Sequence, residues 1–250
     1  MSTAVDLDQA SVRYPDGRGV EALSARLDVG RTVALVGPSG AGKSTLLQLV
    51  AGTIAPDSGS VRTLGQPIAE LRGDAYRAAA GRVGLLGQAD DLTPGLSVLH
   101  NVFAGRLGRW SAARALRNRV WPRADDRRDV QAALVSAELA GRIDADPAEL
   151  SGGERRRVAL ARLGFQGPSL WLADEPTTGL DVRLRTDMMD LLLKMVRDAD
   201  ATAIVALHDL ELLRCDFDEV WGLRRGTLEF MRPAQDVSEV ALESLFGASR

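Results

Sequence analysis

Long hydrophobic runs are missing from this chain of 250 residues. No segment approaches the roughly 20 consecutive apolar residues that a membrane-spanning helix requires. Charged side chains interrupt even the most apolar stretches, such as 188–196. The first residues, 1–9, are acidic and lack the apolar centre of a secretory signal. We therefore expect the chain to remain in water by itself and to reach a membrane only through a partner protein.

Cysteine and lysine are both scarce. Cys215 is the single cysteine, which excludes an internal disulfide and fits a reducing compartment. We interpret it as a small buried hydrophobic residue rather than a reactive thiol. Lys43 and Lys194 are the only lysines, so arginine carries nearly all of the positive charge. This arginine bias is typical of GC-rich coding and indicates no mechanism.

The chain also has no excess of positive charge: it contains 34 acidic and 31 basic residues, and its net charge is -3. With a pI near 5.5, this balance argues against a protein built mainly to hold nucleic acid, and we predict no nucleic-acid partner. A hydrophobic content of 45% and a charged content of 26% are ordinary for a globular protein. The length allows one large domain or two small ones.

The N-terminal part is patterned like a sheet. Residues Val5–Tyr14 alternate and end at the turn Pro15-Asp16-Gly17, and Val20–Val29 return as a second strand. Thr32–Val36 is a continuous apolar run, which is typical of a strand buried in a parallel sheet. A glycine-rich loop follows, and then a helix predicted from Lys43 to about Ala51.

A helical block interrupts this sheet. Between about 88 and 162 the composition shifts to Ala, Arg and Leu at helical spacing, with breaks at Pro122 and Pro147. Strand patterns resume at Ser169–Ala173 and Ala203–Leu207. We predict an α/β unit formed by 1–87 and 163–250, with 88–162 inserted as a helical subdomain.

The glycine-rich loop has the spacing of a phosphate-binding loop, with a strand before it and a helix after it. Its glycines let backbone N–H groups curl around a β-phosphate, Lys43 adds a positive charge at the β/γ oxygens, and the Ser44 hydroxyl can coordinate Mg²⁺. The loop reads Gly37-Pro38-Ser39-Gly40-Ala41-Gly42-Lys43-Ser44-Thr45.

An apolar strand that ends in two acids, Ser169 to Glu175, is the expected partner of this loop. Asp174 is placed to hold Mg²⁺ through water, and Glu175 is placed to polarise an attacking water as a general base. The following residues, 176–181, read Pro-Thr-Thr-Gly-Leu-Asp.

A second glycine turn, Ser151-Gly152-Gly153, opens a helix more than a hundred residues after the loop. A helix start with unpaired N–H groups is an anion site. Because the chain already has one phosphate site, we expect the second to serve a nucleotide held by another subunit. The arginines at 155–157 are interpreted as a solvated helix face, with contact to phosphate or to a partner left open.

From about Ser11 to Gly226 the chain resembles the ATP-binding subunits of ABC transporters, with the motifs in the family order. The resemblance implies an α/β P-loop fold with a mixed β core, an N-terminal antiparallel β subdomain and an inserted helical subdomain. It also implies ATP and Mg²⁺ as ligands and a second ABC cassette, expected to be an identical copy, as partner.

The resemblance assigns further site residues. Tyr14 matches the aromatic that stacks on adenine, although it could equally be a half-buried strand tyrosine. Gln88 matches the glutamine that touches Mg²⁺ and the attacking water, and His208 matches the switch histidine at the γ-phosphate. Ser151, Gly152, Gly153 and Glu154 match the signature motif that closes on the ATP of the facing subunit, and Leu180 and Asp181 match the loop that crosses the dimer interface.

The run from Leu96 to Trp110 is similar to that of phosphonate importer ATPases, whose run ends Ala-Gly-Arg-Leu-Gly. Pro122 and Asp126-Arg127 also fit that subfamily loosely. This implies a membrane permease and an extracytoplasmic substrate-binding protein as partners, and a place at the cytoplasmic face of the inner membrane. Amino-acid-type importers and export or lipoprotein-release ATPases are the competing subfamilies. An inactive nucleotide-binding scaffold also stays open, although Glu175 and His208 argue against it. DNA-repair and translation ABC proteins need a long coiled coil or two cassettes, which this chain lacks.

Overall fold

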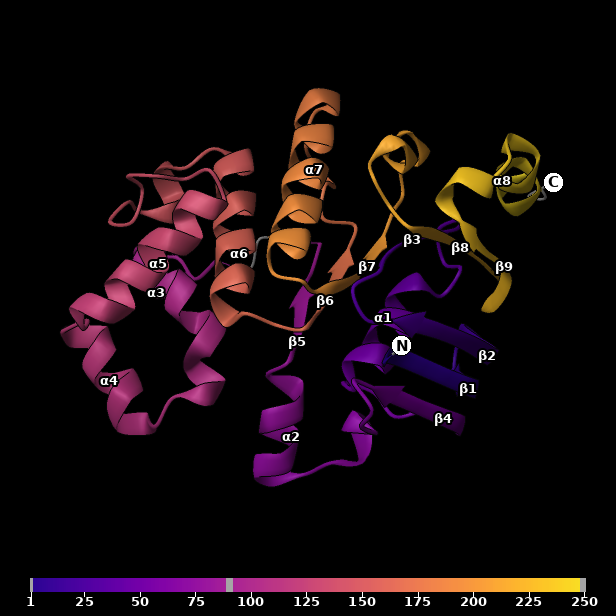
Figure 1. Cartoon of the computed structure of the whole chain (residues 1–250), viewed down its shortest axis with the longest axis horizontal. Helices are drawn as coiled ribbons and strands as arrows, with labels where there is room; N and C mark the ends of the chain where they lie inside the picture. Colours follow the sequence, from indigo (N-terminus) through magenta and orange to yellow (C-terminus); the bar gives the residue numbers. More distant parts are fainter. Residues whose placement is uncertain (1, 89–91, 248–250) are drawn as a thin grey trace.

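The computed structural model describes residues 2–88 and 92–247, and it confirms the α/β class (Figure 1). An antiparallel sheet of order β2-β1-β4 forms the N-terminal part, from β1 (Thr3–Arg13), β2 (Gly19–Asp28) and β4 (Ser58–Thr63). The first two strands were predicted to within two residues, and the turn at 15–17 joins them. Gly17 takes a left-handed φ of 79° there, which is a conformation that glycine adopts readily.

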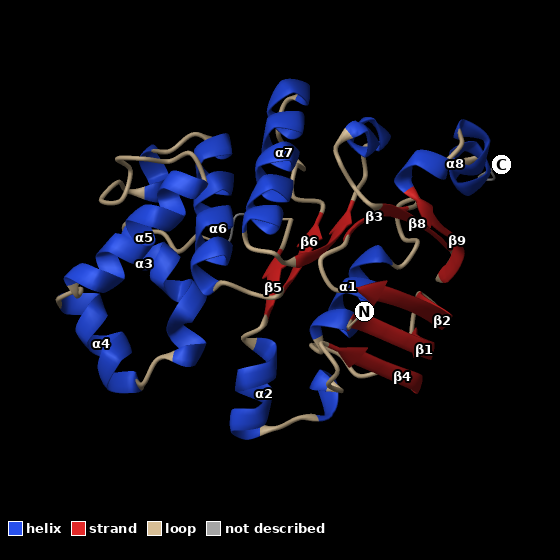
Figure 2. Ribbon diagram, viewed as in Figure 1, coloured by secondary structure: helices blue, strands red, loops and turns tan. Residues whose placement is uncertain are grey.

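A six-stranded sheet of order β5-β6-β7-β3-β8-β9 forms the centre of the molecule (Figure 2). All neighbouring pairs run parallel except the last, where β9 returns antiparallel to β8. The predicted strand Thr32–Val36 is β3, with the same ends. The other strands are β5 (Val83–Leu86), β6 (Leu170–Asp174), β7 (Thr202–Ala206), β8 (Glu219–Arg224) and β9 (Thr227–Pro233).

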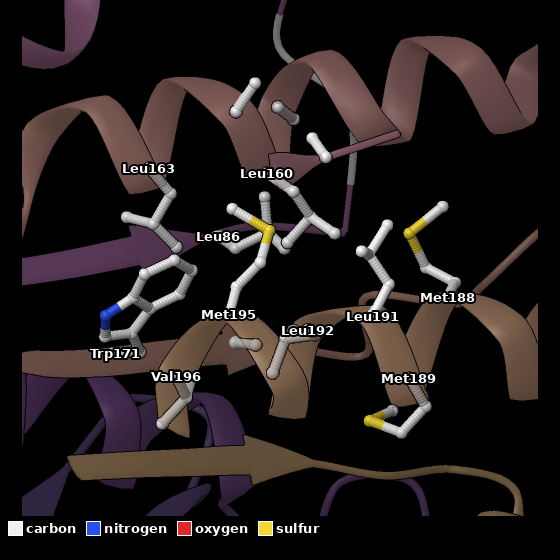
Figure 3. Packing of buried hydrophobic residues seen from close by; sticks show 14 of the residues in the cluster. Leu86, Leu160, Leu163, Trp171, Met188, Met189, Leu191, Leu192, Met195 and Val196 are labelled. Carbon is white, nitrogen blue, oxygen red and sulfur yellow. The ribbon is translucent and has the colours of Figure 1, made fainter. Parts of the chain in front are cut away.

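The central sheet is buried on both faces, which explains why its strands are continuous apolar runs. In β3, Val33 and Leu35 pack into one hydrophobic cluster, and Ala34 and Val36 into the other. The first cluster lies under helix α1 (Lys43–Ala51) and the antiparallel sheet. The second lies under α6 (Gly152–Gln166) and α7 (Val182–Asp198), whose leucines and methionines pack against each other with Trp171 at one end of the group (Figure 3).

The helical block stands beside the β5 edge of the central sheet (Figure 1). The predicted break at Pro122 falls between two of its helices, and Pro147 is the first residue of a 3-10 turn. The block holds α3 (Val98–Phe103), η2 (Ala104–Arg109), α4 (Ala112–Val120), α5 (Ala124–Ser136), η3 (Pro147–Glu149) and α6.

The remaining elements are short and were not predicted: η1 (Ile68–Glu70), α2 (Gly73–Ala80), η4 (Leu210–Arg214), η5 (Ala234–Asp236) and α8 (Glu239–Phe246). Within residues 2–88 and 92–247, no helix combines the length and the apolar character needed to cross a bilayer.

Candidate functional site

The carboxyl ends of three adjacent strands bring the predicted site residues to one edge of the central sheet. Ala206 at the end of β7 pairs with Asp174 of β6 on one side and with Leu35 of β3 on the other. The chain leaves β3 into the glycine-rich loop, β6 into Glu175 and β7 into His208. Segments far apart in sequence therefore meet at this edge, because parallel strands end together.

The glycine-rich loop passes too close to β8 to tolerate a side chain at its first position. A Cβ atom on Gly37 would overlap the carbonyl oxygen of Leu223, and one on Gly42 would meet the side chain of Val20. Lys43, the first residue of α1, folds back over the loop. Its ammonium donates hydrogen bonds to the carbonyl oxygens of Gly37 at 2.8 Å and Pro38 at 3.3 Å.

Lys43 and Glu175 form the charged centre of the site. Their Nζ and Oε1 atoms lie 3.8 Å apart, and the Lys43 side chain is only 5% exposed. Burial lowers the Lys43 pKa, and the negative charges of Glu175 and Asp174 oppose that change. The lysine thus lies beside the Glu175 carboxylate at the base of the loop, which is where a phosphate charge would be compensated.

A cavity of about 640 Å³ opens above this pair. It brings together the loop, Gln88 from the end of β5 and Tyr14 from the turn after β1. The Tyr14 ring is half-buried, and its hydroxyl donates a long hydrogen bond of 3.4 Å to Gln48 on α1. The lining residues are Tyr14, Pro15, Asp16, Arg18, Gly19, Gln88, Glu175 and the loop from Ser39 to Thr45.

Asp174 has the features of a metal-binding carboxylate. Its Oδ1 atom is buried and has no hydrogen-bond partner among the described residues, and the Ser44 hydroxyl lies near its carboxyl group. Burial raises the Asp174 pKa and Glu175 adds to the rise, while Ser44 and Lys43 lower it. An orphaned carboxylate oxygen beside a hydroxyl is a donor set that suits Mg²⁺, so these residues fit the metal that the sequence predicts.

Glu175 is held by its backbone in an uncommon conformation, with a left-handed φ of 47°. Such backbone strain is often stored at functional sites. The Glu175 N–H donates to the Ala206 carbonyl at 3.1 Å. The Thr178 N–H and hydroxyl donate to the carbonyl and carboxylate of Glu175, at 3.1 and 3.4 Å. The loop after β6 thus fixes the carboxylate at the cavity wall.

His208 and Asp181 lie outside the cavity lining described above. His208 is exposed at the end of β7, and Asp181 caps α7 by accepting a hydrogen bond from the Leu184 N–H at 3.0 Å. Next to His208, Asp209 forms an ion pair of 3.1 Å with Arg185 of α7. Both predicted residues stand on the same sheet edge as the loop, but no contact with Lys43 or Glu175 is found for either among the described residues.

The signature turn is less bare than the sequence suggested. Ser151 and Glu154 form a capping box: the Ser151 Oγ accepts from the Glu154 N–H at 3.2 Å, and Glu154 Oε2 accepts from the Ser151 N–H at 2.9 Å. The hydrogen bonds that the carboxylate accepts from the Ser151 N–H and hydroxyl lower the Glu154 pKa, with a smaller effect of Arg142. A carboxylate therefore already satisfies part of this helix start, and an incoming anion must compete with it.

Sequence reasoning missed Arg156. The arginines at 155–157 were interpreted as a solvated helix face, and for Arg156 that was wrong: it is only 8% exposed. Its guanidinium donates to the backbone carbonyls of Gly87, Gln88 and Thr178. The signal that could have revealed it is its helical spacing, since it lies three, four and seven residues before the buried Ala159, Leu160 and Leu163 and so shares their side of α6.

A glycine-rich loop between β3 and α1, facing an acidic strand end, defines a P-loop protein that binds and hydrolyses a nucleoside triphosphate. The ABC transporter family matches residues 20–178. The chain belongs to that family and is an ABC transporter ATPase.

Related proteins and solved structures match this chain over nearly its whole length. The phosphonates import ATP-binding protein PhnC of Pseudomonas putida is 37% identical, over 98% of this chain and 90% of its own length. The dimeric structure of a bacterial ABC transporter cassette is 26% identical with a TM-score of 0.80, covering 93% of this chain and 100% of its own. A cassette in a post-hydrolysis state with ADP and Pi is 28% identical with a TM-score of 0.74, over the same shares.

Proposed function

We propose that this chain is the ATPase subunit of an importer for phosphonates or a related phosphorus oxyanion. The observation that supports the ATPase site best is the single cavity that joins the glycine-rich loop, Tyr14, Gln88 and Glu175 above the Lys43–Glu175 pair. The cargo rests on the relatives, which carry the name of phosphonate import proteins.

In this proposal the cavity holds ATP. The Tyr14 ring lies against the adenine, the loop N–H groups surround the β-phosphate, and Lys43 turns from its backbone carbonyls to the β and γ oxygens. Each of those carbonyl contacts is a hydrogen bond to a neutral acceptor, and phosphate oxygens replace it with one in which both partners are charged. A cassette of this family has been solved with ADP and Pi bound.

Glu175 acts as the general base. Its carboxylate accepts a hydrogen bond from the Thr178 hydroxyl, and its backbone N–H donates to the Ala206 carbonyl. From the cavity wall the carboxylate accepts a proton from the attacking water. Gln88 orients that water and His208 reaches the γ-phosphate once the subunits close. Ser44, Gln88 and Asp174 would hold Mg²⁺, which supplies positive charge to the phosphate oxygens when bound.

The second half of each site comes from a facing cassette, so we infer a head-to-tail dimer. Gly152 and Gly153 offer backbone N–H groups, and the Ser151 hydroxyl offers a donor once it leaves Glu154, for the γ-phosphate of the other copy. Asp181, at the start of α7, lies in the loop expected to cross that interface. Related cassettes have been solved as dimers.

A groove beside the site suits a helix of the membrane permease. It has a volume of about 490 Å³ and lies between α2 and β5 on one side and η2 and α6 of the helical subdomain (88–162) on the other. Leu85, 45% exposed in it, precedes Gln88 by three residues, so motion of a docked helix reaches the cavity directly. The groove is lined by Tyr76, Arg77, Leu85, Gly105, Arg109 and Gln166, among others. The permease would hold the chain at the cytoplasmic face of the inner membrane and receive cargo from a substrate-binding protein.

The test combines two assays. The purified chain, at a concentration that favours dimers, should hydrolyse ATP only with Mg²⁺, and Lys43→Ala should abolish this. In the complex with permease and binding protein, phosphonates should stimulate hydrolysis more than amino acids do. Stimulation by amino acids alone would contradict the cargo, and a lack of any ATP hydrolysis would contradict the enzymatic proposal.

A further inference from the structure

Arg156 occupies a position from which one side chain reaches three parts of the proposed active site. It belongs to α6, in the turn that follows the Ser151 capping box. One guanidinium nitrogen donates to the Gly87 carbonyl at 3.3 Å, and the other donates to the carbonyls of Gln88 and, at 3.2 Å, Thr178. The contacts join α6 to the segment after β5 and to the segment after β6.

The first of these segments has little other support from regular structure. β5 ends at Leu86, and Gly87 and Gln88 are outside any helix or strand. The Gln88 side chain is exposed and lines the cavity, so its orientation depends on how its backbone is held. Arg156 holds that backbone through two successive carbonyl groups, from within the protein.

The second segment carries Glu175. Thr178 donates hydrogen bonds to the carbonyl and carboxylate of Glu175, and its own carbonyl accepts from Arg156. The guanidinium is therefore linked to the proposed general base through Thr178 alone, and it contacts the backbone of Gln88 directly. The Glu175 carboxylate and the Gln88 side chain must both be correctly placed around the attacking water, since a displacement of about 1 Å can lower the rate of hydrolysis by about a hundredfold.

The chemistry of the contact suits arginine in particular. Three carbonyl oxygens from two separate segments approach one buried group, and the planar guanidinium has five N–H donors in a fixed fork. A lysine ammonium on a flexible stem supplies donors without that fixed geometry, and a glutamine supplies one neutral NH₂ group. Because a helix moves as a rigid unit, Ser151 at its start and Arg156 move together.

We infer that Arg156 is a positioning residue that holds Gln88 and the Glu175 segment in place relative to each other and links both to α6. This inference rests on the proposed ATPase site and adds a residue to it. Arg156 is not among the residues that line the cavity, and it acts through Gln88 and Thr178. Closure of the facing subunit onto Ser151 would then be transmitted through α6 to the water-activating side of the same chain's site.

The test compares Arg156→Gln and Arg156→Lys with Arg157→Gln as the matched control. Arg157 lies on the same helix, and its substitution makes the same change of charge. Its ion pair of 2.7 Å is with Glu138, away from both segments. ATP binding and steady-state hydrolysis are measured well below the thermal midpoint of each variant, so that loss of folded protein does not enter the rates.

We expect Arg156→Gln to lower kcat between about tenfold and a hundredfold while the KM for ATP stays within about twofold, because the loop and Tyr14 are untouched. Arg156→Lys should be intermediate, and Arg157→Gln should match the parent. In a double-mutant cycle, Gln88→Ala should cost far less in the Arg156→Gln background than in the parent, because both changes disable the same group.

Unchanged kcat in Arg156→Gln, or additive losses in the cycle, would overturn the inference. If Arg156→Gln does not fold, Arg156→Lys and its cycle with Gln88→Ala decide the matter alone. If the parent chain and Arg156→Gln hydrolyse ATP equally well, only the role of Arg156 is refuted. A parent without ATPase activity refutes the proposed function itself.

Discussion

The ammonium nitrogen of Lys43 lies 3.8 Å from Oε1 of Glu175, and the two side chains are only 5% and 21% exposed. Lys43 comes from the helix after β3 and Glu175 from the end of β6, with β7 between these strands. The phosphate-binding charge and the proposed general base therefore share one partly buried pair, and each compensates the other until a phosphate arrives. This pairing makes the consequences of single substitutions specific.

Replacing Glu175 by glutamine should separate binding from hydrolysis. The amide keeps the size of the side chain but cannot accept a proton, so we expect the ATPase rate to fall by about a hundredfold or more. ATP binding should persist, and the nucleotide should trap a dimer that gel filtration detects. A variant that hydrolyses ATP at the parent rate would show that another group is the base.

Replacing Asp174 by asparagine should stabilise the free protein. Burial raises the pKa of Asp174 in the folded state. The folded protein therefore holds the proton of this carboxyl group more tightly than the unfolded chain does, and the protein loses stability as the pH rises through the folded pKa. We expect the free energy of unfolding at pH 7.5 to increase by about 1 kcal/mol, with the gain shrinking towards pH 4.

Urea denaturation measures this change, and Asp187→Asn, at an exposed position of α7, is the control. The same Asp174→Asn variant should lose the extra stability that Mg²⁺ adds in the presence of ATP, because a neutral amide is a much weaker ligand for Mg²⁺ than a carboxylate. A variant less stable than the parent would contradict the expected gain in stability. A variant that keeps its Mg²⁺ response would contradict the proposed metal role.

Replacing Glu154 by glutamine should favour the ATP-driven dimer. The Glu154 carboxylate accepts from Ser151 and places a negative charge at the proposed γ-phosphate site. Glutamine can keep the capping contacts through its amide oxygen and removes the charge. In a Glu175→Gln background we expect the dimer to form at an ATP concentration several-fold lower, whereas Glu229→Gln, at an exposed position of β9, should leave it unchanged. Weaker dimerisation would mean that the negative charge of Glu154 does not repel the γ-phosphate.

Cys215 should be unreactive in the folded protein. It is 8% exposed, and burial, together with the charge and hydrogen bond of Asp190, raises its pKa to about 12. Since the thiolate is the reactive form, iodoacetamide at pH 8 should label the native chain far more slowly than the chain in urea. Equal labelling rates would contradict the buried position.

Gly105→Ala should destabilise the contact between η2 and α6. A Cβ atom at Gly105 would overlap the backbone carbonyl of Arg162 on α6, whereas at Gly108, in the same 3-10 helix, it meets nothing within 4 Å. We expect a loss of about 1–3 kcal/mol for Gly105→Ala and almost none for Gly108→Ala. Thermal unfolding of the two variants side by side measures the difference, and equal midpoints would contradict the packing described for η2.

Local pattern predicted the elements that position the site. β3 and α1 begin and end where the sequence indicated, because a continuous apolar run and a glycine-rich loop before a helix are strong local signals. The breaks at Pro122 and Pro147 follow from the missing N–H of proline. The hairpin of β8 and β9 had a usable signal in Arg225-Gly226 between two strand-like runs, whereas the four residues of β5 are too few to show a period.

By itself, then, the sequence determined the phosphate loop, the acidic end of β6, the signature turn and the order in which they occur, since each depends on neighbouring residues. The Ser151–Glu154 capping box is local as well, because it joins residues only three apart. Only the tertiary structure decided that Asp174 keeps an orphaned oxygen and that Arg156 is buried against Gln88 and Thr178. The burial of Arg156 depends on which distant backbone groups lack a partner after the sheet has formed. A carbonyl without a partner has no signature in its own stretch of sequence, and it is known only when the side chain that satisfies it arrives from another part of the fold.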